Sequence, residues 1–144
     1  AKGILLVLGG PDANVASTLN TILYTIGNAL AGVPSFIGAL FMYLFQSCFN
    51  LIVTSNSGQA ALTMPIMAPL ADLVGVTRQV AVLAFQMGAG FVDAFTPVSA
   101  SLIGVLGVAR IDWGKWAKFQ IKMQAFFFLM GTVAIAIAIA VNLQ

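Results

Sequence analysis

The sequence predicts an all-α integral membrane protein made of a re-entrant helical hairpin, a discontinuous helix and a terminal transmembrane helix. Of its 144 residues, 60% are apolar and 7% are charged, a composition typical of chains embedded in a bilayer. A short polar segment at residues 54–59 separates two strongly apolar segments. A third apolar segment is interrupted by glycine, proline and polar residues, as in helices that unwind within a membrane.

The composition also argues against several classes of function. The chain has no histidine and a single cysteine, Cys48, so it can form no internal disulfide and shows no metal-binding cluster. No nucleophile–base pair is visible either, and we therefore expect no enzymatic activity. The net charge of +2 is small, and no aromatic and basic residues alternate as in nucleic-acid-binding chains, so nucleic acid is not an expected partner.

Residues 1–32 are interpreted as the end of a preceding helix followed by an amphipathic helix. The turn at Gly9–Asp12 separates the two, and apolar residues then recur at helical spacing up to residue 31, opposite an uncharged polar face. This helix either packs against neighbouring helices or lies along the membrane interface as an arm that links two moving parts.

The re-entrant hairpin is predicted at residues 33–75, with its tip at residues 54–58. The apolar segment 34–53 is long enough for a helix of about 30 Å, whereas 59–75 is shorter and contains Pro65 and Pro69, which should bend or break it. At such a tip, free carbonyls end one helix and free amides begin the next, so ions of either sign can be held. Irregular backbone at this depth is tolerated where protein or a wet cavity surrounds it.

Two amides precede the tip on one face of the first helix. Gln46 and Asn50 are four residues apart and therefore lie on the same side. They either bond to neighbouring helices or line a cavity beneath the tip.

A discontinuous transmembrane helix is predicted at residues 76–110, unwound near 88–101. The interrupting residues are Gly88, Gly90, Asp93, Thr96, Pro97, Ser99 and Ser101. A carboxylate at mid-membrane costs roughly 2.5–3.5 kcal/mol on insertion scales, so Asp93 is interpreted first as functional. The alternative is that it pairs with a cation on a helix that this chain does not contain.

A basic and aromatic loop is predicted at residues 111–118, followed by the terminal transmembrane helix at 119–144. Four of the six basic residues lie near this loop, and Trp113 and Trp116 are interpreted as anchors at the membrane interface. The positive-inside rule then places 110–118 in the cytoplasm and 72–78 outside, in a multi-pass protein of the inner (cell) membrane.

The run SNSGQAALTMPIMAPLADLVGVTRQVAVLAFQ at 55–86 resembles the YfcC-type family of basic-amino-acid antiporters and C4-dicarboxylate-carrier-like proteins, in the ion transporter superfamily. The resemblance extends more loosely over 34–143, including GKW at 114–116. It implies one of the two inverted repeats of an elevator-type transporter. It also implies that a hairpin-tip motif binding substrate and coupling ion lies at Ser55, Asn56, Ser57 and Gly58. The broken-helix loop would lie at Gly88, Gly90, Thr96, Pro97 and Ser99.

Two residues depart from the family pattern. Relatives usually have an acidic residue where this chain has Ala89, and an amide where it has Asp93. The two positions are one helical turn apart, so a carboxylate at 93 would remain on the same face if the helix persists. This carboxylate has three alternative binding partners: a sodium ion near Asn56 and Asp93, a proton on Asp93, or the cationic group of an amino-acid solute.

We therefore expect half or a fragment of a secondary active transporter for a small carboxylate-bearing solute, either an amino acid or a dicarboxylate. Transport would be coupled to an ion gradient or to exchange, with Na⁺ or H⁺ as coupling ion and no other cofactor. The missing partner would be a second repeat or a homo-oligomer partner. The alternative is a small oligomeric membrane protein that acts as a passive pore or a scaffold.

Overall fold

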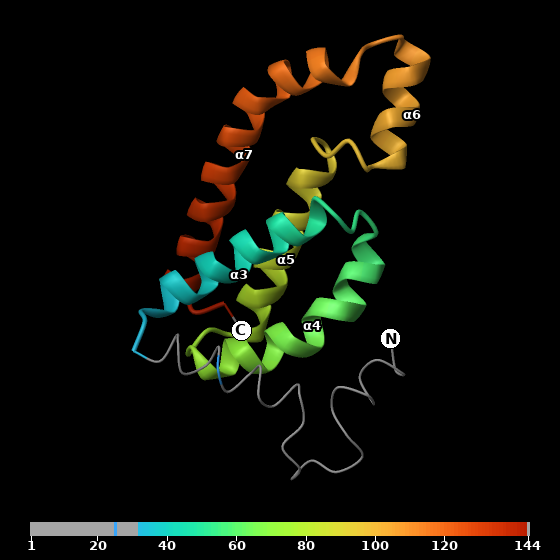
Figure 1. Cartoon of the computed structure of the whole chain (residues 1–144). Helices are drawn as coiled ribbons and strands as arrows, with labels where there is room; N and C mark the ends of the chain where they lie inside the picture. Colours follow the sequence, from blue (N-terminus) through green and yellow to red (C-terminus); the bar gives the residue numbers. More distant parts are fainter. Residues whose placement is uncertain (1–24, 26–31, 144) are drawn as a thin grey trace, which may run out of the picture.

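The described part of the protein contains α-helices joined by short connections, which confirms the predicted all-α class. The computed structural model describes Thr25 and residues 32–143. The expected helix end and amphipathic arm of residues 1–32 therefore lie, apart from Thr25 and Gly32, outside the described residues. The helices are α3 (Ser35–Asn50), α4 (Asn56–Leu73), α5 (Arg78–Asp93), α6 (Ala100–Ala109) and α7 (Trp113–Ala140) (Figure 1).

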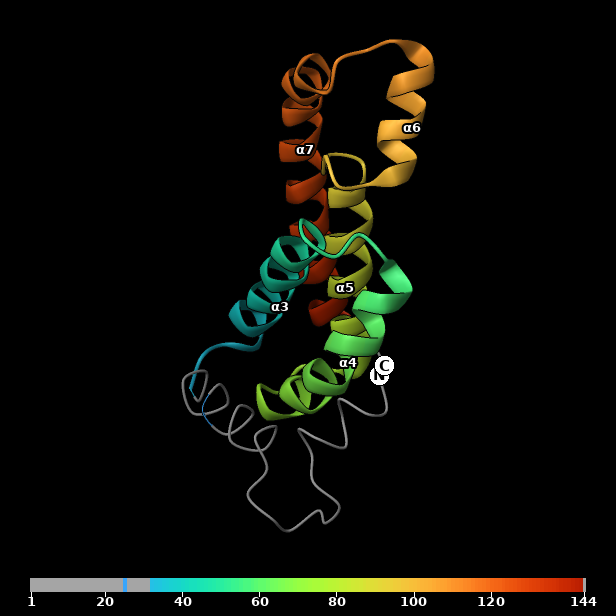
Figure 2. The same ribbon diagram turned by 45° about the vertical axis from the view of Figure 1, so that its right-hand side comes forward.

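Helices α3 and α4 form a hairpin whose connection is residues 51–55. Ser55 caps α4, because its hydroxyl oxygen accepts a hydrogen bond from the Gly58 N–H at 3.3 Å. The helix α4 continues through Pro65 and Pro69, and Figures 1 and 2 show it as a bent helix. A bend without a break agrees with proline, which removes one backbone hydrogen bond and crowds the preceding turn.

A short connection joins α4 to α5. Gly75 adopts a positive φ of 68°, which glycine tolerates better than other residues just beyond a helix end. Arg78 donates to Asp72 at 2.7 Å, and this exposed ion pair lies across the connection. The hydrogen bond from the Arg78 guanidinium lowers the pKa of the Asp72 carboxyl below its ordinary value.

The discontinuous helix consists of α5 and α6, separated by residues 94–99. This break is shorter than the predicted 88–101, so Gly88 and Gly90 lie inside α5. In Figures 1 and 2, α6 continues beyond the break, away from the hairpin. Leu106 is the buried residue of α6, and the helix exposes most of its remaining apolar surface.

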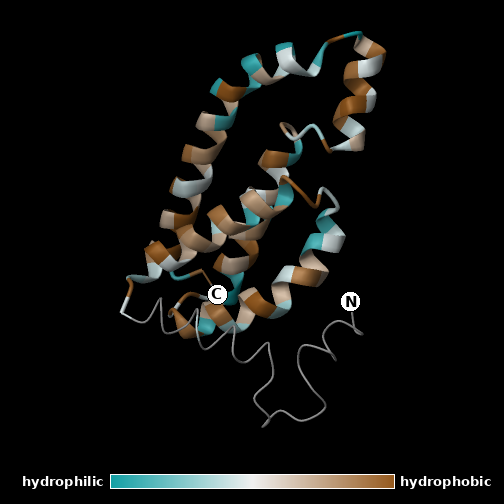
Figure 3. Ribbon diagram, viewed as in Figure 1, coloured by the Kyte–Doolittle hydropathy of each residue, from teal (hydrophilic) through white to brown (hydrophobic). Residues whose placement is uncertain are grey.

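The helix α7 begins at Trp113, whereas the sequence predicted a loop up to residue 118. Asp112 caps it, since its side chain accepts from the Gly114 N–H at 2.9 Å. Among the described helices, α7 alone has both the length and the apolar composition needed to cross a membrane. Figure 3 shows hydrophilic residues in its first turns and mostly apolar residues after them.

The core lies where α3, α4, α5 and the second half of α7 meet, and α3 packs most extensively on α5. Gly88 allows this close packing. A Cβ at this position would lie 3.1 Å from the Cβ of Gln46 and 3.1 Å from the backbone nitrogen of Ser47, in the facing turn of α3. The buried apolar side chains of the core are Ala39, Met42, Tyr43, Met67, Leu70, Ala71, Val74, Val76, Val80, Ala81, Ala84, Ile135 and Ala138.

Candidate functional site

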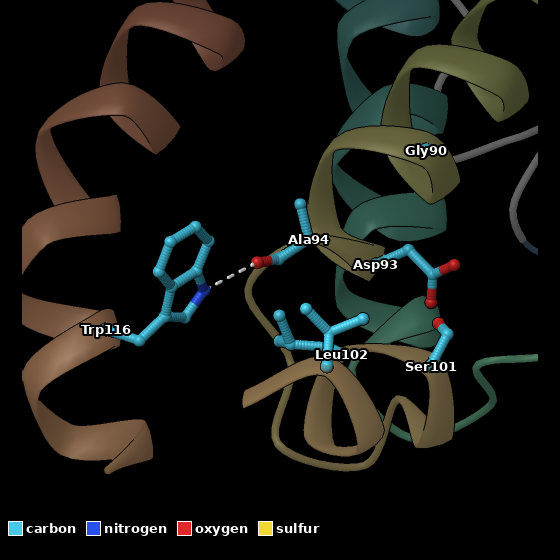
Figure 4. A pocket seen from close by; sticks show the side chains of 7 residues that line it. Gly90, Asp93, Ala94, Ser101, Leu102 and Trp116 are labelled. Carbon is cyan, nitrogen blue, oxygen red and sulfur yellow. Dashed lines mark hydrogen bonds between the residues drawn. The ribbon is translucent and has the colours of Figure 1, made fainter. Parts of the chain in front are cut away.

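A pocket of about 460 Å³ opens at the break of the discontinuous helix. It lies between the end of α5, the first turns of α6 and the start of α7 (Figure 4). Its lining residues are Gly90, Asp93, Ala94, Ser101, Leu102, Val105 and Trp116. A carboxylate, a hydroxyl and an indole thus stand among small and aliphatic side chains.

Asp93 is the last residue of α5 and is the only lining residue with an ionisable side chain. Its Oδ1 atom is buried and has no hydrogen-bond partner among the described residues. Figure 4 shows the carboxylate pointing toward the side chain of Ser101. Within the described part of the chain the ion pair is that of Asp72 and Arg78, so no described cationic side chain neutralises Asp93.

The residues of the hairpin tip lie at the surface of the described chain. Ser55, Asn56 and Ser57 are exposed and Gly58 is half-buried. The hydroxyls of Ser55 and Ser57 are 3.5 Å apart. These residues form the N-terminus of α4, where free amides and the helix dipole favour an anionic group such as a carboxylate.

Two hydrogen bonds hold the end of α3 against the discontinuous helix. The Asn50 amide nitrogen donates to the carbonyl of Ala89 at 2.6 Å. The Thr96 hydroxyl donates to the carbonyl of Leu51 at 3.2 Å. The start of the hairpin connection and the break are therefore joined directly, although Leu51 and Thr96 are 45 residues apart in the sequence.

A buried polar cluster lies beneath the tip, between α3 and α4. The Gln59 amide nitrogen donates to Gln46 Oε1 at 2.8 Å and to the Gln46 carbonyl at 2.9 Å, and Gln46 bonds to the Thr63 hydroxyl at 3.0 Å. Gln46 and Asn50 thus bond to neighbouring helices, which was the first of the two interpretations. The oxygens Asn50 Oδ1 and Gln59 Oε1 have no hydrogen-bond partner among the described residues.

The predicted residues of the broken-helix loop have different surroundings. Gly88 packs against α3, whereas Gly90 lines the pocket. Thr96 is fully buried, and Pro97 is exposed in the break. Ser99 precedes α6, and its hydroxyl lies 3.0 Å from that of Ser101. Among the described residues, no hydrogen bond joins the side chains of 55–58 to Asp93.

Five of the lining residues were not predicted as binding residues: Ala94, Ser101, Leu102, Val105 and Trp116. Leu102 and Val105 carry no chemical signal in a helix that is largely apolar. The spacing of Trp113 and Trp116 was visible, but it is equally typical of a membrane-interface anchor. The described residues contain no group of three His, Cys, Asp or Glu side chains that could hold a metal.

The chain matches a family of carriers. A model of the C4-dicarboxylate anaerobic carrier family, DcuC, matches residues 1–140. The chain is 54% identical over 135 residues to "Putative basic amino acid antiporter YfcC" of Escherichia coli K12, covering 94% of this chain and 27% of that protein. It is 34% identical over 143 residues to an uncharacterized protein of Haemophilus influenzae, covering 97% of this chain and 26% of the relative.

No solved structure matches the chain. It spans about a quarter of the length of the two curated relatives, so further parts of the polypeptide accompany this region in them. The family match and the apolar helix α7 together indicate a membrane protein. The family resemblance at residues 55–86 is confirmed, and the chain belongs to the C4-dicarboxylate anaerobic carrier family.

Proposed function

We propose that this chain is one substrate- and ion-binding repeat of a secondary active transporter for a small carboxylate-bearing solute, either an amino acid or a dicarboxylate. Transport is coupled to an ion gradient or to exchange. The observation that carries the proposal is the hydrogen bond from Thr96, in the break, to Leu51, at the start of the hairpin connection, together with a buried carboxylate oxygen of Asp93 that has no described partner. Paired helix ends of this kind present both donors and acceptors to a solute.

The charge of Asp93 restricts what binds beside it. The pocket walls are largely apolar, and a carboxylate in such a place is favourable only with a cationic partner, a proton or several hydrogen-bond donors. We propose that the partner is a coupling sodium ion, a transferred proton or the cationic group of an amino acid. A sodium ion bound near Asn56 and Asp93 remains one of these three proposals.

The tip supplies the complementary chemistry. Free amides at the first turn of α4 favour the carboxylate of the solute, and the exposed hydroxyls of Ser55 and Ser57 add hydrogen-bonding groups. An amino acid brings both a carboxylate and a cationic group, whereas a dicarboxylate brings anionic groups alone. The family description names C4-dicarboxylates and the Escherichia coli relative's name specifies basic amino acids, so the two solute classes are the ones to compare.

The complete binding site requires more than this chain. We infer that a second, inverted repeat contributes the facing hairpin and broken helix, either in the same polypeptide or from a second copy, and that the repeats move together as an elevator across the inner membrane. The short length of this chain relative to its relatives supports the need for further parts.

The test is Asp93→Asn in the full-length protein reconstituted into liposomes, with uptake of radiolabelled L-arginine and succinate measured under sodium and proton gradients. We expect a loss of about 10- to 100-fold in the affinity for the cationic species, as for a charged hydrogen bond. Lost sodium dependence identifies a sodium ligand, lost pH dependence identifies a proton carrier, and lost arginine affinity with unchanged succinate affinity identifies a contact to the solute.

Asp72→Asn is the matched control, because it removes an exposed carboxylate of the same chain that is paired with Arg78. Its transport should equal that of the parent. If Asp93→Asn also equals the parent under every gradient, Asp93 is a structural residue. Solute flux that no ion gradient drives uphill would instead identify a passive pore.

A further inference from the structure

The first turns of α7 carry two indoles that bond to the end of α5. The Trp116 Nε1–H donates to the carbonyl of Ala94 at 3.1 Å (Figure 4). The Trp113 Nε1–H donates to the carbonyl of Phe95 at 3.2 Å. Carbonyls at a helix C-terminus lack partners within their own helix. Two consecutive carbonyls that follow α5 are thus satisfied by side chains from another helix.

Several features of α7 position the two indoles. Trp113 and Trp116 are three residues apart, so they project from the same face of α7. The helix that carries them is capped by Asp112 at its first turn. The ring of Trp113 also lies against that of Phe95, with centroids 6.2 Å apart, so packing and hydrogen bonding act at the same place.

An anchor at the membrane interface would use these indoles differently. An indole has a single N–H donor, and both donors are engaged by protein carbonyls rather than left for lipid headgroups. Trp113 and Trp116 are also the two tryptophans of the chain. The two indoles therefore contact the break of the protein through hydrogen bonds that a lipid-facing anchor would not make.

We propose that Trp113 and Trp116 are positioning residues that clamp the break of the discontinuous helix against α7 and thereby hold Asp93 in the pocket. This inference rests on the proposed function, because Asp93 is the binding residue that the clamp positions. The Ala94 carbonyl held by Trp116 follows Asp93 directly in the chain, and Trp116 also forms a wall of the same pocket.

The clamp complements the bond from Thr96 to the end of α3. The break is attached to α3 by Thr96 and to α7 by the two tryptophans. We therefore expect the break, the C-terminal end of α3 and the start of α7 to move as one unit. Movement of α7 away from the break would release two hydrogen bonds and separate the rings of Phe95 and Trp113.

A distance measurement tests the clamp independently of transport. Spin labels are attached at Val98→Cys in the break and at Ile121→Cys on α7, both exposed positions, in full-length protein whose native cysteines, Cys48 included, are replaced by serine. The double variant Trp113→Phe/Trp116→Phe should widen the distribution of label distances. Phe126→Leu, which changes an exposed aromatic residue of the same helix, should leave it as in the parent. An unchanged distribution in the double variant would overturn the clamp.

Solute binding tests the positioning role. Binding of L-arginine and succinate to the purified full-length protein should weaken by about 2- to 10-fold for each indole removed, as expected for one neutral hydrogen bond. Benzothienylalanine in place of Trp116 keeps the ring shape and replaces the N–H by sulfur, so it should weaken binding as Trp116→Phe does. Wider label distances with unchanged affinity would overturn the positioning role.

The two proposals fail in different ways. If the parent protein binds neither solute and transports neither, the proposed function is wrong, and the spin-label distances still decide whether the indoles hold the break. If the parent transports and the double variant matches it in affinity, the proposed function stands and the positioning role is rejected.

Discussion

At the scale of single residues, Gly131 determines how closely α7 approaches the hairpin. A Cβ at Gly131 would lie 2.6 Å from the hydroxyl oxygen and 2.8 Å from the Cζ of Tyr43. Tyr43 is 1% exposed and stacks on Phe128, with ring centroids 5.0 Å apart. The tyrosine has little room to yield, so the absence of a side chain at 131 is a packing requirement of the α3–α7 contact.

Gly131→Ala should therefore lower the free energy of unfolding by about 1–3 kcal/mol, as overpacking does in closely packed cores. Thermal unfolding of the purified protein in detergent measures the effect. Gly107→Ala is the matched control, because a Cβ at Gly107 in α6 meets no atom within 4 Å and alanine favours a helix over glycine. Equal stability of the two variants would show that Tyr43 moves aside freely.

The chemistry of the site residues could be predicted from the sequence better than their contacts. Asp93 stood out because a carboxylate is rare in an apolar segment, and it does line the pocket. Gly88 looked like a loop residue, yet it permits close packing of α5 on α3. The role of Trp116 depended on a carbonyl 22 residues away, and no local pattern records such a contact.

At the scale of helices, helix-breaking and turn-forming residues predicted which segments are helical, while capping and tertiary contacts determined where the helices begin and end. Glycine, proline and polar residues marked the hairpin connection and the break. The helix α7 begins at Trp113 and not at the expected residue 119, because Asp112 caps the helix there and the indoles bond to the break. Lysines in the first turns of a helix can extend into water, so their charge did not prevent it from beginning there.

The start of α5 depends on Thr77 in two ways. Its hydroxyl accepts from the Val80 N–H at 3.4 Å and donates to the carbonyl of Leu143 at 2.6 Å. The same side chain thus caps α5 and fixes the residues that follow α7. Thr77→Ala should destabilise the protein by about 1–2 kcal/mol, as the loss of a helix cap typically does.

Thr77→Ser is the control, since it keeps the hydroxyl and should retain most of the stability. Denaturant unfolding followed by circular dichroism separates the two variants. If serine destabilises the protein as much as alanine, the methyl group of Thr77 and not its hydroxyl carries the effect.

At the scale of the whole described chain, the two polar connections lie at opposite ends. Figure 1 shows the α4–α5 connection at one end and the α6–α7 connection at the other, with the hairpin tip between them. The 28 residues of α7 extend about 40 Å, more than the roughly 30 Å of a bilayer core. Its lysine-rich first turns can therefore stand outside the hydrocarbon while its apolar remainder crosses it.

The positive-inside rule assigns the orientation of the chain from the basic residues around the start of α7. In a protein whose native cysteines, including Cys48, are replaced by serine, Leu73→Cys should react with an impermeant maleimide from outside the cell. Ile111→Cys should react only after the membrane is opened. Both positions are exposed, and neither substitution changes a charge, so the orientation itself is not perturbed. Labelling of both cysteines from the same side would contradict a hairpin that enters from outside and a terminal helix that crosses the membrane.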